Sequence, residues 1–166
     1  EVVNKFIPIV AKNRRLMVFD SSISTFKEFT LSDLHSIPHA SQIVVSPVNQ
    51  NRFLLVGGHY FKKPSEKVFE LDATTSEFVI LESLKVARWM HRTATHKNIV
   101  FVTGGVTNDK ETPTNSVERF DWETRKWIDL KPMINARHSH VSVIFDPNHK
   151  QTLSIDRKPI SLFVIG

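Results

Sequence analysis

Two arginines stand at the same distance before a histidine, and these side chains could bind an anion or transfer protons. Arg88 lies three residues before His91, and Arg137 lies three residues before His140. Guanidinium groups in a partly shielded site suit bidentate capture of carboxylates. The alternative is that each arginine joins neighbouring elements through backbone carbonyl groups. The sequence leaves both roles open.

Metal binding and nucleophilic catalysis have less support. His138 and His140 are two residues apart and would share one face of an extended chain, but no third metal ligand stands beside them. Ser139 has no acid at a recognisable spacing, and no G-x-S-x-G motif is present. The absence of cysteine excludes disulfides, thiol catalysis and cysteine-ligated zinc or iron–sulfur sites. We therefore predict no catalytic residue, no metal site and no cofactor.

Acidic residues recur in short polar segments that favour turns. In FDWETRKW, residues 120–127, Asp121 precedes Thr124 by three residues, and Asp72 precedes Thr75 in the same way. Asp and Thr at this spacing can hydrogen-bond the nearby backbone and so stabilise a tight turn. The recurrence favours structure over catalysis, because an active site is normally built once.

Three copies of one pattern run through the chain without a gap. Their anchors, Asp20, Asp72 and Asp121, are separated by 52 and 49 residues. A large apolar residue stands one position before each anchor, an aromatic residue six after it and a histidine nineteen after it. These columns are Phe19, Leu71 and Phe120; Phe26, Phe78 and Trp127; and His39, His91 and His140. We expect the histidines to be structural hydrogen-bonding groups at the start of inner strands, and Phe78 and Trp127 to pack between neighbouring units.

All five glycines follow short runs that favour β-structure. Gly57 and Gly58 follow RFLLV, Gly104 and Gly105 follow NIVFVT, and Gly166 follows SLFVI. Glycine at the end of a strand indicates a bulge or a close backbone approach. No segment shows helical periodicity over a window of about 11 residues. The pattern predicts about four strands in each unit of about 50 residues.

Together these features resemble the kelch-repeat β-propeller family. The resemblance rests on the diglycines, on the FELDATTSEF and ERFDWETRKW hairpins and on the two R-x-x-H motifs. It implies an all-β fold, a kelch-type β-propeller segment of four-stranded antiparallel blades within a larger ring of about six or seven blades. We expect one partial propeller domain over 1–166, with an incomplete or degenerate blade at 1–35, whole blades at 36–84 and 85–133, and the start of the next blade at 134–166. The scheme contains about 13 strands.

The resemblance also implies where a partner would bind. In this family strands a to d run from the central channel outward, and the d–a and b–c connections surround one mouth of the channel. Arg88 and Arg137, with Ser36 in the equivalent place of the first repeat, would line that mouth, where related domains bind acidic peptides. The b–c connection at 59–67 adds aromatic and basic residues suited to a binding hot spot, namely Tyr60, Phe61, Lys62 and Lys63. The alternative is that Tyr60 or Phe61 folds back onto the blade.

Two other connections stand out. The polar b–c connection at 106–116 is typical of a mobile loop. The segment at 146–161 lengthens an a–b hairpin on the opposite face, either as family decoration or as a contact specific to this protein.

Composition narrows the class of partner. The net charge of +5 favours acidic partners, but lysine and arginine are scattered, which argues against nucleic acid. No apolar run has the length of a membrane span. The first residue is not Met, and we expect a piece of a longer, cytoplasmic protein, with association with the cytoskeleton as a further option.

The predicted function is a non-catalytic scaffold for protein–protein interaction. Kelch relatives suggest cytoskeletal, ciliary or ubiquitin-ligase assemblies. The alternative is a propeller enzyme of the sugar epimerase or metal-assisted lyase type, with active residues partly outside this chain. Copper radical oxidases with a kelch-like fold need a cysteine cross-linked to a tyrosine, and this chain has no cysteine and the single Tyr60.

Overall fold

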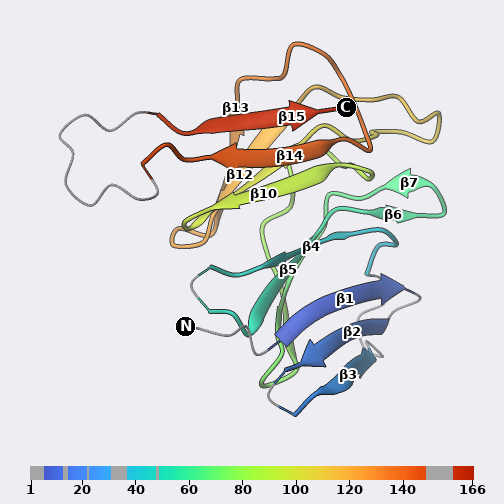
Figure 1. Ribbon diagram of the computed structural model, residues 1–166. Coiled ribbons are helices and arrows are strands. Elements are labelled where there is room, and N and C mark those ends of the chain that lie inside the picture. Colours follow the sequence, from blue (N-terminus) through green and yellow to red (C-terminus); the bar gives the residue numbers. More distant parts are fainter. Residues whose placement is uncertain (1–5, 13–14, 22, 31–36, 48, 149–158) are drawn as a thin grey trace.

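The computed structural model describes residues 6–12, 15–21, 23–30, 37–47, 49–148 and 159–166 (Figure 1). Every regular element in these ranges is a β-strand. Within the same ranges no helix is present that could cross a membrane. The predicted all-β class is therefore confirmed.

The strands form antiparallel meanders in which each strand pairs with the next strand of its blade. The first sheet contains β1 (Phe6–Lys12), β2 (Arg15–Asp20) and β3 (Thr25–Thr30). The second sheet contains β4 (Gln42–Val45), β5 (Arg52–Val56), β8 (Val68–Asp72) and β9 (Glu77–Ile80). The third sheet contains β10 (Arg92–His96), β11 (Ile99–Thr103), β12 (Val117–Asp121) and β13 (Lys126–Leu130). The last sheet pairs β14 (Val141–Phe145) with β15 (Ser161–Ile165).

A small hairpin, β6 (His59–Tyr60) and β7 (Lys63–Pro64), lies between β5 and β8. It projects beyond the end of the second sheet (Figure 1). The other strands match the expected succession of three, four, four and two blade strands.

The sheets are stacked side by side, and their inner strands are neighbours. β10 lies between β4 and β14, so it joins three successive blades on the channel side (Figure 1). This arrangement brings the d–a connections and the b–c connections to one end of the sheets. We call this end the mouth face.

β5 is buried on both faces, and its two faces belong to different cores. Phe53 and Leu55 pack in the core shared with Val18 of the first sheet. Leu54 and Val56, which point the other way because side chains alternate along a strand, pack in the core shared with the third sheet. Burial on both faces explains why this strand is a continuous apolar run.

The two aromatic residues that follow the Asp turns lie in these cores. Trp127 is buried between the second and third sheets, and its indole Nε1 donates to the Glu82 carbonyl oxygen at 2.8 Å. Phe78 is partly buried in the core between the first and second sheets. Trp122 packs its ring edge against Phe120 and contacts the same core as Trp127.

The anchor aspartates of the second and third sheets stabilise c–d turns. Asp72 Oδ1 accepts from the backbone N–H of Thr74 at 2.9 Å, and Asp121 Oδ1 accepts from that of Glu123 at 2.8 Å. Both carboxylates therefore serve the backbone, as in the turn that the sequence predicted. Asp20 is buried at the corresponding turn of the first sheet.

The first repeat is out of register with the predicted columns at the start of β4. His39 exchanges two backbone hydrogen bonds with His59, as Trp89 does with Val106. His39 therefore occupies the position of Trp89, and the prediction that it shares the column of His91 was wrong. The cause is two extra residues between Phe26 and Ser41, compared with the stretch from Phe78 to His91.

The histidine position of this repeat falls on Ser41, whose hydroxyl lies 2.8 Å from the carbonyl oxygens of Pro38 and Gly57. The arginine position falls on Pro38. Ser36, which the sequence placed there, lies outside the described residues.

Candidate functional site

Arg88 is enclosed in the protein, with 0% of its side chain exposed. Its Nη2 donates to Glu118 Oε1 at 2.6 Å, and its Nη1 donates to the carbonyl oxygens of Gly104 and Ser116. Burial lowers the pKa of this guanidinium, and Glu118 offsets part of that effect. Arg88 joins the connection before β10 to β11 and β12. The expectation that it lines an open mouth is therefore corrected in favour of the alternative role.

Glu118 completes this buried connection. Besides Arg88, its carboxylate accepts from the backbone N–H groups of Lys85 at 2.7 Å and Val86 at 3.2 Å. The carboxylate is fully buried, so these bonds replace the water it has lost. The sequence analysis missed Glu118. A buried arginine calls for a charged partner, but the burial of Arg88 is not visible in the sequence.

Arg137 has the same position one blade later. Its Nη1 donates to the carbonyl oxygen of Gly166 at 2.9 Å and makes a longer contact of 3.4 Å with that of Val164. Unlike Arg88, it is partly exposed. It therefore joins two blades and retains access to the surface.

His91 and His140 are buried, neutral imidazoles. Burial and nearby arginines lower the pKa of His91 to about 3 and the pKa of His140 to about 4. Nε2 of His140 lies 2.8 Å from the Thr103 hydroxyl. Val56 holds the position of Thr103 next to His91, and its backbone approaches the ring without a hydrogen bond of normal geometry. The two histidines are structural groups of the channel wall.

The diglycines allow these rings to pack against the backbone. Gly57 has a φ of +58°, and a Cβ there would stand 2.7 Å from the Arg88 carbonyl oxygen and 2.8 Å from His91 Cε1. Gly104 has the same relation to Arg137 and His140. Only glycine fits such a position without a shift of the neighbouring blade.

The β6–β7 hairpin carries the four other predicted binding residues. Its pairs His59–Pro64 and Tyr60–Lys63 leave Phe61 and Lys62 as a two-residue loop. We call these two residues the hairpin tip. Phe61 is 97% exposed, and Lys62 and Lys63 are exposed as well. Tyr60 is half-buried, and Lys67 Nζ lies 5.8 Å from the centre of its ring.

The hairpin tip is strained. Phe61 has a φ of 47° and Lys62 a φ of 63°, which are the left-handed values of a type I′ turn. This turn favours Asn-Gly, and the left-handed conformation costs a residue with a Cβ about 1 kcal/mol or more. Neither residue recovers that cost by burial, because both are exposed. A large apolar side chain is thus held in solvent against its own conformational preference.

Three rings packed at tilted angles form the base of this hairpin. The His59 ring lies 5.7 Å from the His39 ring and 4.6 Å from the Trp89 ring, measured between ring centres. Burial, and next to it the charge of His39, lowers the pKa of His59. This packing fixes the root of the hairpin to the connections before β4 and β10. A rigid base of this kind presents the tip in one direction.

The neighbouring b–c connection, residues 106–116, is ordered by its own hydrogen bonds. Asn108 Oδ1 accepts from the backbone N–H groups of Lys110 at 3.1 Å and Thr112 at 3.0 Å. It projects on the same side of the molecule as β6–β7 (Figure 1). The connection thus contains its own hydrogen bonds, and its mobility stays a prediction.

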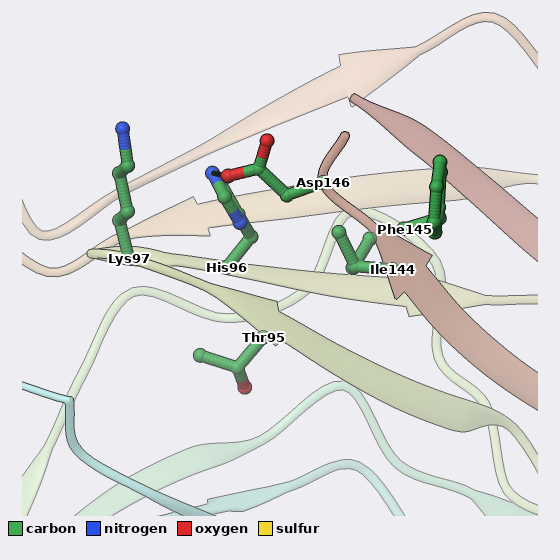
Figure 2. Close-up of a pocket in the computed structure, with 6 residues that line it drawn as sticks. All are labelled: Thr95, His96, Lys97, Ile144, Phe145 and Asp146. Atoms are coloured by element: carbon green, nitrogen blue, oxygen red, sulfur yellow. Dashed lines mark ion pairs between the residues drawn. The ribbon is translucent and has the colours of Figure 1, made fainter. Parts of the chain in front are cut away.

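A pocket of about 560 Å³ lies at the opposite end of the sheets, between β10 and β14. Figure 2 shows His96 and Asp146 facing each other across it, 3.7 Å apart, while Thr95 points away from them. The backbone N–H of Asn148 holds the pKa of the Asp146 carboxyl below its usual value. One imidazole and one carboxylate at this distance form an ion pair when the imidazole is protonated. Residues 149–158 of the 146–161 segment lie outside the described ranges.

Metal ligands do not gather in the described residues. There, no three histidine, aspartate or glutamate side chains are placed to hold an ion. His138 is exposed, whereas His140 points inward to Thr103, so the pair does not share one site.

Comparisons with known proteins agree with this geometry. The family model of the kelch motif matches residues 88–134. Kelch-like protein 41b of Danio rerio is 33% identical over 125 residues, which cover 75% of this chain and 20% of that protein. The chain thus spans about a fifth of the curated relative that it matches.

A solved structure shows the same fold at low identity. It is a novel fungal alcohol oxidase with catalytic diversity among the AA5 family, in complex with copper. The match has a TM-score of 0.67 at 15% identity and covers 84% of this chain and 32% of that chain. The chain is a member of the kelch-repeat family and folds as a segment of a β-propeller.

Proposed function

We propose that this chain is a non-catalytic platform for protein interaction and that the hairpin tip is its recognition element. Kelch repeats and the kelch-like relative support an interaction scaffold in general. The observation that carries the finer proposal is Phe61, a strained residue that is 97% exposed at the end of a rigid hairpin. Backbone strain clusters at binding and switch sites, and at Phe61 it accompanies a large apolar side chain that is held in solvent.

The chemistry of the tip indicates the class of partner. Lys62 and Lys63 flank Phe61 with two exposed ammonium groups, and the chain carries a net charge of +5. An acidic segment with an apolar pocket or side chain would match both features. Arg137, which is partly exposed on the same face, is a second candidate contact. Arg88 is not part of this surface.

We further propose a cytoplasmic setting, with which the absence of cysteine agrees. Cytoskeletal, ciliary and ubiquitin-ligase assemblies are the settings that the family suggests. The name of the kelch-like relative specifies none of these settings, so partner capture must identify the assembly.

Truncation of the tip tests the proposal. Partners captured from a lysate by the wild-type protein are identified by mass spectrometry, and the captured segment is then titrated against variants. Phe61→Ala and Lys62→Glu are each expected to weaken binding about tenfold or more, as central hot-spot residues do. Both side chains are exposed, so the melting temperature is expected to stay unchanged or to rise.

Matched controls come from elsewhere on the surface. Ile80→Ala removes an exposed apolar side chain from β9, and Lys97→Glu reverses an exposed charge at the opposite end. Both are expected to bind like the wild type. Equal binding by Phe61→Ala and Ile80→Ala would refute the assignment of the tip.

The enzyme alternative has one structural feature in its favour, the His96–Asp146 pair at the pocket. The pair is built once, unlike the repeated residues. Two lining residues carry a nucleophilic group, Thr95, whose side chain points away from the pair, and Lys97. Turnover by purified protein that disappears in His96→Gln would favour this alternative.

A further inference from the structure

His59 stands at the root of the β6–β7 hairpin and makes a hydrogen bond to its tip. Its Nδ1 accepts from the backbone N–H of Lys62 at 3.3 Å, so this side chain joins the first residue of β6 to the two-residue loop. Lys62 is one of the two left-handed residues of the hairpin tip. The bond therefore helps to hold the turn in a conformation that its residues do not favour.

This bond determines where the His59 ring can take up a proton. A neutral imidazole carries one proton, and Nδ1 presents its lone pair to the Lys62 N–H, so that proton is on Nε2. A second proton can bind only at Nδ1. Protonation would turn the acceptor into a donor that faces another donor, and the bond to Lys62 would be lost.

A second imidazole stands directly opposite. His39 and His59 exchange two backbone hydrogen bonds of 2.8 Å, and their ring centres lie 5.7 Å apart. Two imidazolium groups at this distance repel each other. The repulsion acts at the same two backbone bonds that attach the hairpin to the connection before β4.

The other groups around the His59 ring do not offset this repulsion. From the connection before β10, Trp89 packs against His59 and does not titrate, while the Arg88 side chain is enclosed in its own network. From the hairpin itself the charged groups are Lys62 and Lys63, and both are positive. In the described part of the chain, no carboxylate forms an ion pair with His59.

The direction of the pH effect follows from these surroundings. Burial, and next to it the charge of His39, lowers the pKa of His59 below its ordinary value of 6.5. A His59 ring released from the hairpin root would be exposed and would titrate near that ordinary value. The closed root is therefore fully stable above pH 6.5 and loses stability relative to the open root as the pH falls below it.

We propose that His59 is a pH-sensitive switch for the hairpin tip: protonation at Nδ1 opens the hairpin root and weakens the binding of the partner. This inference rests on the proposed function, because it concerns the regulation of the same recognition element. An open hairpin no longer presents Phe61 in one direction, so binding must first restore that order. The added positive charge alone would favour an acidic segment. Loss of order and gain of charge thus predict opposite changes in affinity.

Backbone order parameters from NMR relaxation test the opening without a partner. In the wild type we expect Phe61 and Lys62 to be rigid at pH 7.5, with order parameters of about 0.85, and flexible at pH 5, with values below about 0.6. His59→Asn places an oxygen acceptor where Nδ1 stands and cannot titrate. Its tip is expected to be equally ordered at both pH values.

Two further variants separate His59 from the other histidines. His39→Gln removes the opposing imidazole, so the pKa of His59, followed by NMR of its ring, is expected to rise toward 6.5. His138→Gln, at an exposed histidine of the next d–a connection, is expected to leave it unchanged. His91 and His140 are present in every variant and cannot cause a difference between them. If His59→Asn does not fold, the shift in His39→Gln decides.

A tip that stays ordered at pH 5, or that loses order equally in the wild type and in His59→Asn, would overturn the switch. So would an unchanged pKa of His59 in His39→Gln.

Affinity for the segment captured by the wild-type protein tests the consequence for binding. Between pH 7.5 and 5 we expect the wild type to lose about tenfold and His59→Asn less than about twofold, since apparent affinity falls with the closed fraction. A gain in wild-type affinity at pH 5 would assign the effect to charge and overturn the proposal. Equal binding by Phe61→Ala and the wild type would refute the proposed function instead, because the order parameters are measured without a partner.

Discussion

Two buried imidazoles occupy equivalent places in successive blades and differ in one hydrogen bond. His140 shares its Nε2 with the Thr103 hydroxyl, whereas His91 meets Val56 at the same place. Both rings stay neutral in the folded protein because burial disfavours the charged imidazole, and nearby arginines add repulsion. The residues beside the two imidazoles, Thr103 and Val56, are thus similar in shape and differ in polarity.

The first prediction concerns pH. The pKa values of about 3 for His91 and about 4 for His140 lie below the ordinary value of 6.5 that each has when unfolded. The unfolded chain therefore gains protons first, and the stability present above pH 6.5 is lost as the pH falls toward 4. We expect each histidine to reduce the free energy of unfolding by about 2 kcal/mol at pH 5, relative to neutral pH. Urea unfolding at pH 7.5, 6 and 5 measures this.

The double variant His91→Gln/His140→Gln is the control, since it removes both titrating groups. Its stability should be lower than that of the wild type at pH 7.5 but should change less between pH 7.5 and 5. A parallel decline in the two proteins would show that other groups cause the acid sensitivity.

The Arg88–Glu118 pair links elements rather than single residues. It connects the linker after β9 to β11 and β12, and it holds two backbone N–H groups of that linker. In the second sheet, Pro38 and Phe69 fill the same two places with apolar groups. Either the ion pair or the apolar pair fills the space between neighbouring blades. Removal of one member of the ion pair leaves the other as an unpaired buried charge.

Substitution of Arg88 alone tests whether Glu118 without its partner is a destabilising buried charge. Arg88→Met should lower the free energy of unfolding by about 3–5 kcal/mol, because Glu118 is left charged in a dry site. Arg88→Met/Glu118→Gln should lose less than the sum of the single variants. Arg52→Met, whose side chain is 43% exposed in its ion pairs with Glu70 and Asp72, should cost about 1 kcal/mol or less. Equal losses in the Arg88 and Arg52 variants would contradict the account.

For the whole molecule, the order of the blades could be predicted from the sequence because it depends on local signals. The Asp turns, the diglycines and the apolar runs each lie within a few residues of the structure they specify. The register at His39 was missed because the two added residues between Phe26 and Ser41 leave no compositional signal. The burial of Arg88 was missed because it depends on Glu118, which lies 30 residues away. The type I′ turn at Phe61 was missed because neither Phe nor Lys is a turn residue.

At the hairpin tip the backbone departs from what its sequence favours locally, because Phe61 and Lys62 both have left-handed φ values, and the proposed function rests on this tip. If the strain at Phe61 and Lys62 is retained for recognition, a better turn sequence should stabilise the protein and impair binding. Phe61→Asn/Lys62→Gly supplies the preferred type I′ residues.

The most direct measurement is therefore the free energy of unfolding of Phe61→Asn/Lys62→Gly alongside its affinity for the captured acidic segment. We predict a gain of about 1–2 kcal/mol in stability, from relief of two left-handed residues, together with a loss of about tenfold or more in affinity. A variant that is more stable and binds as tightly as the wild type would contradict the claim that this tip recognises the partner.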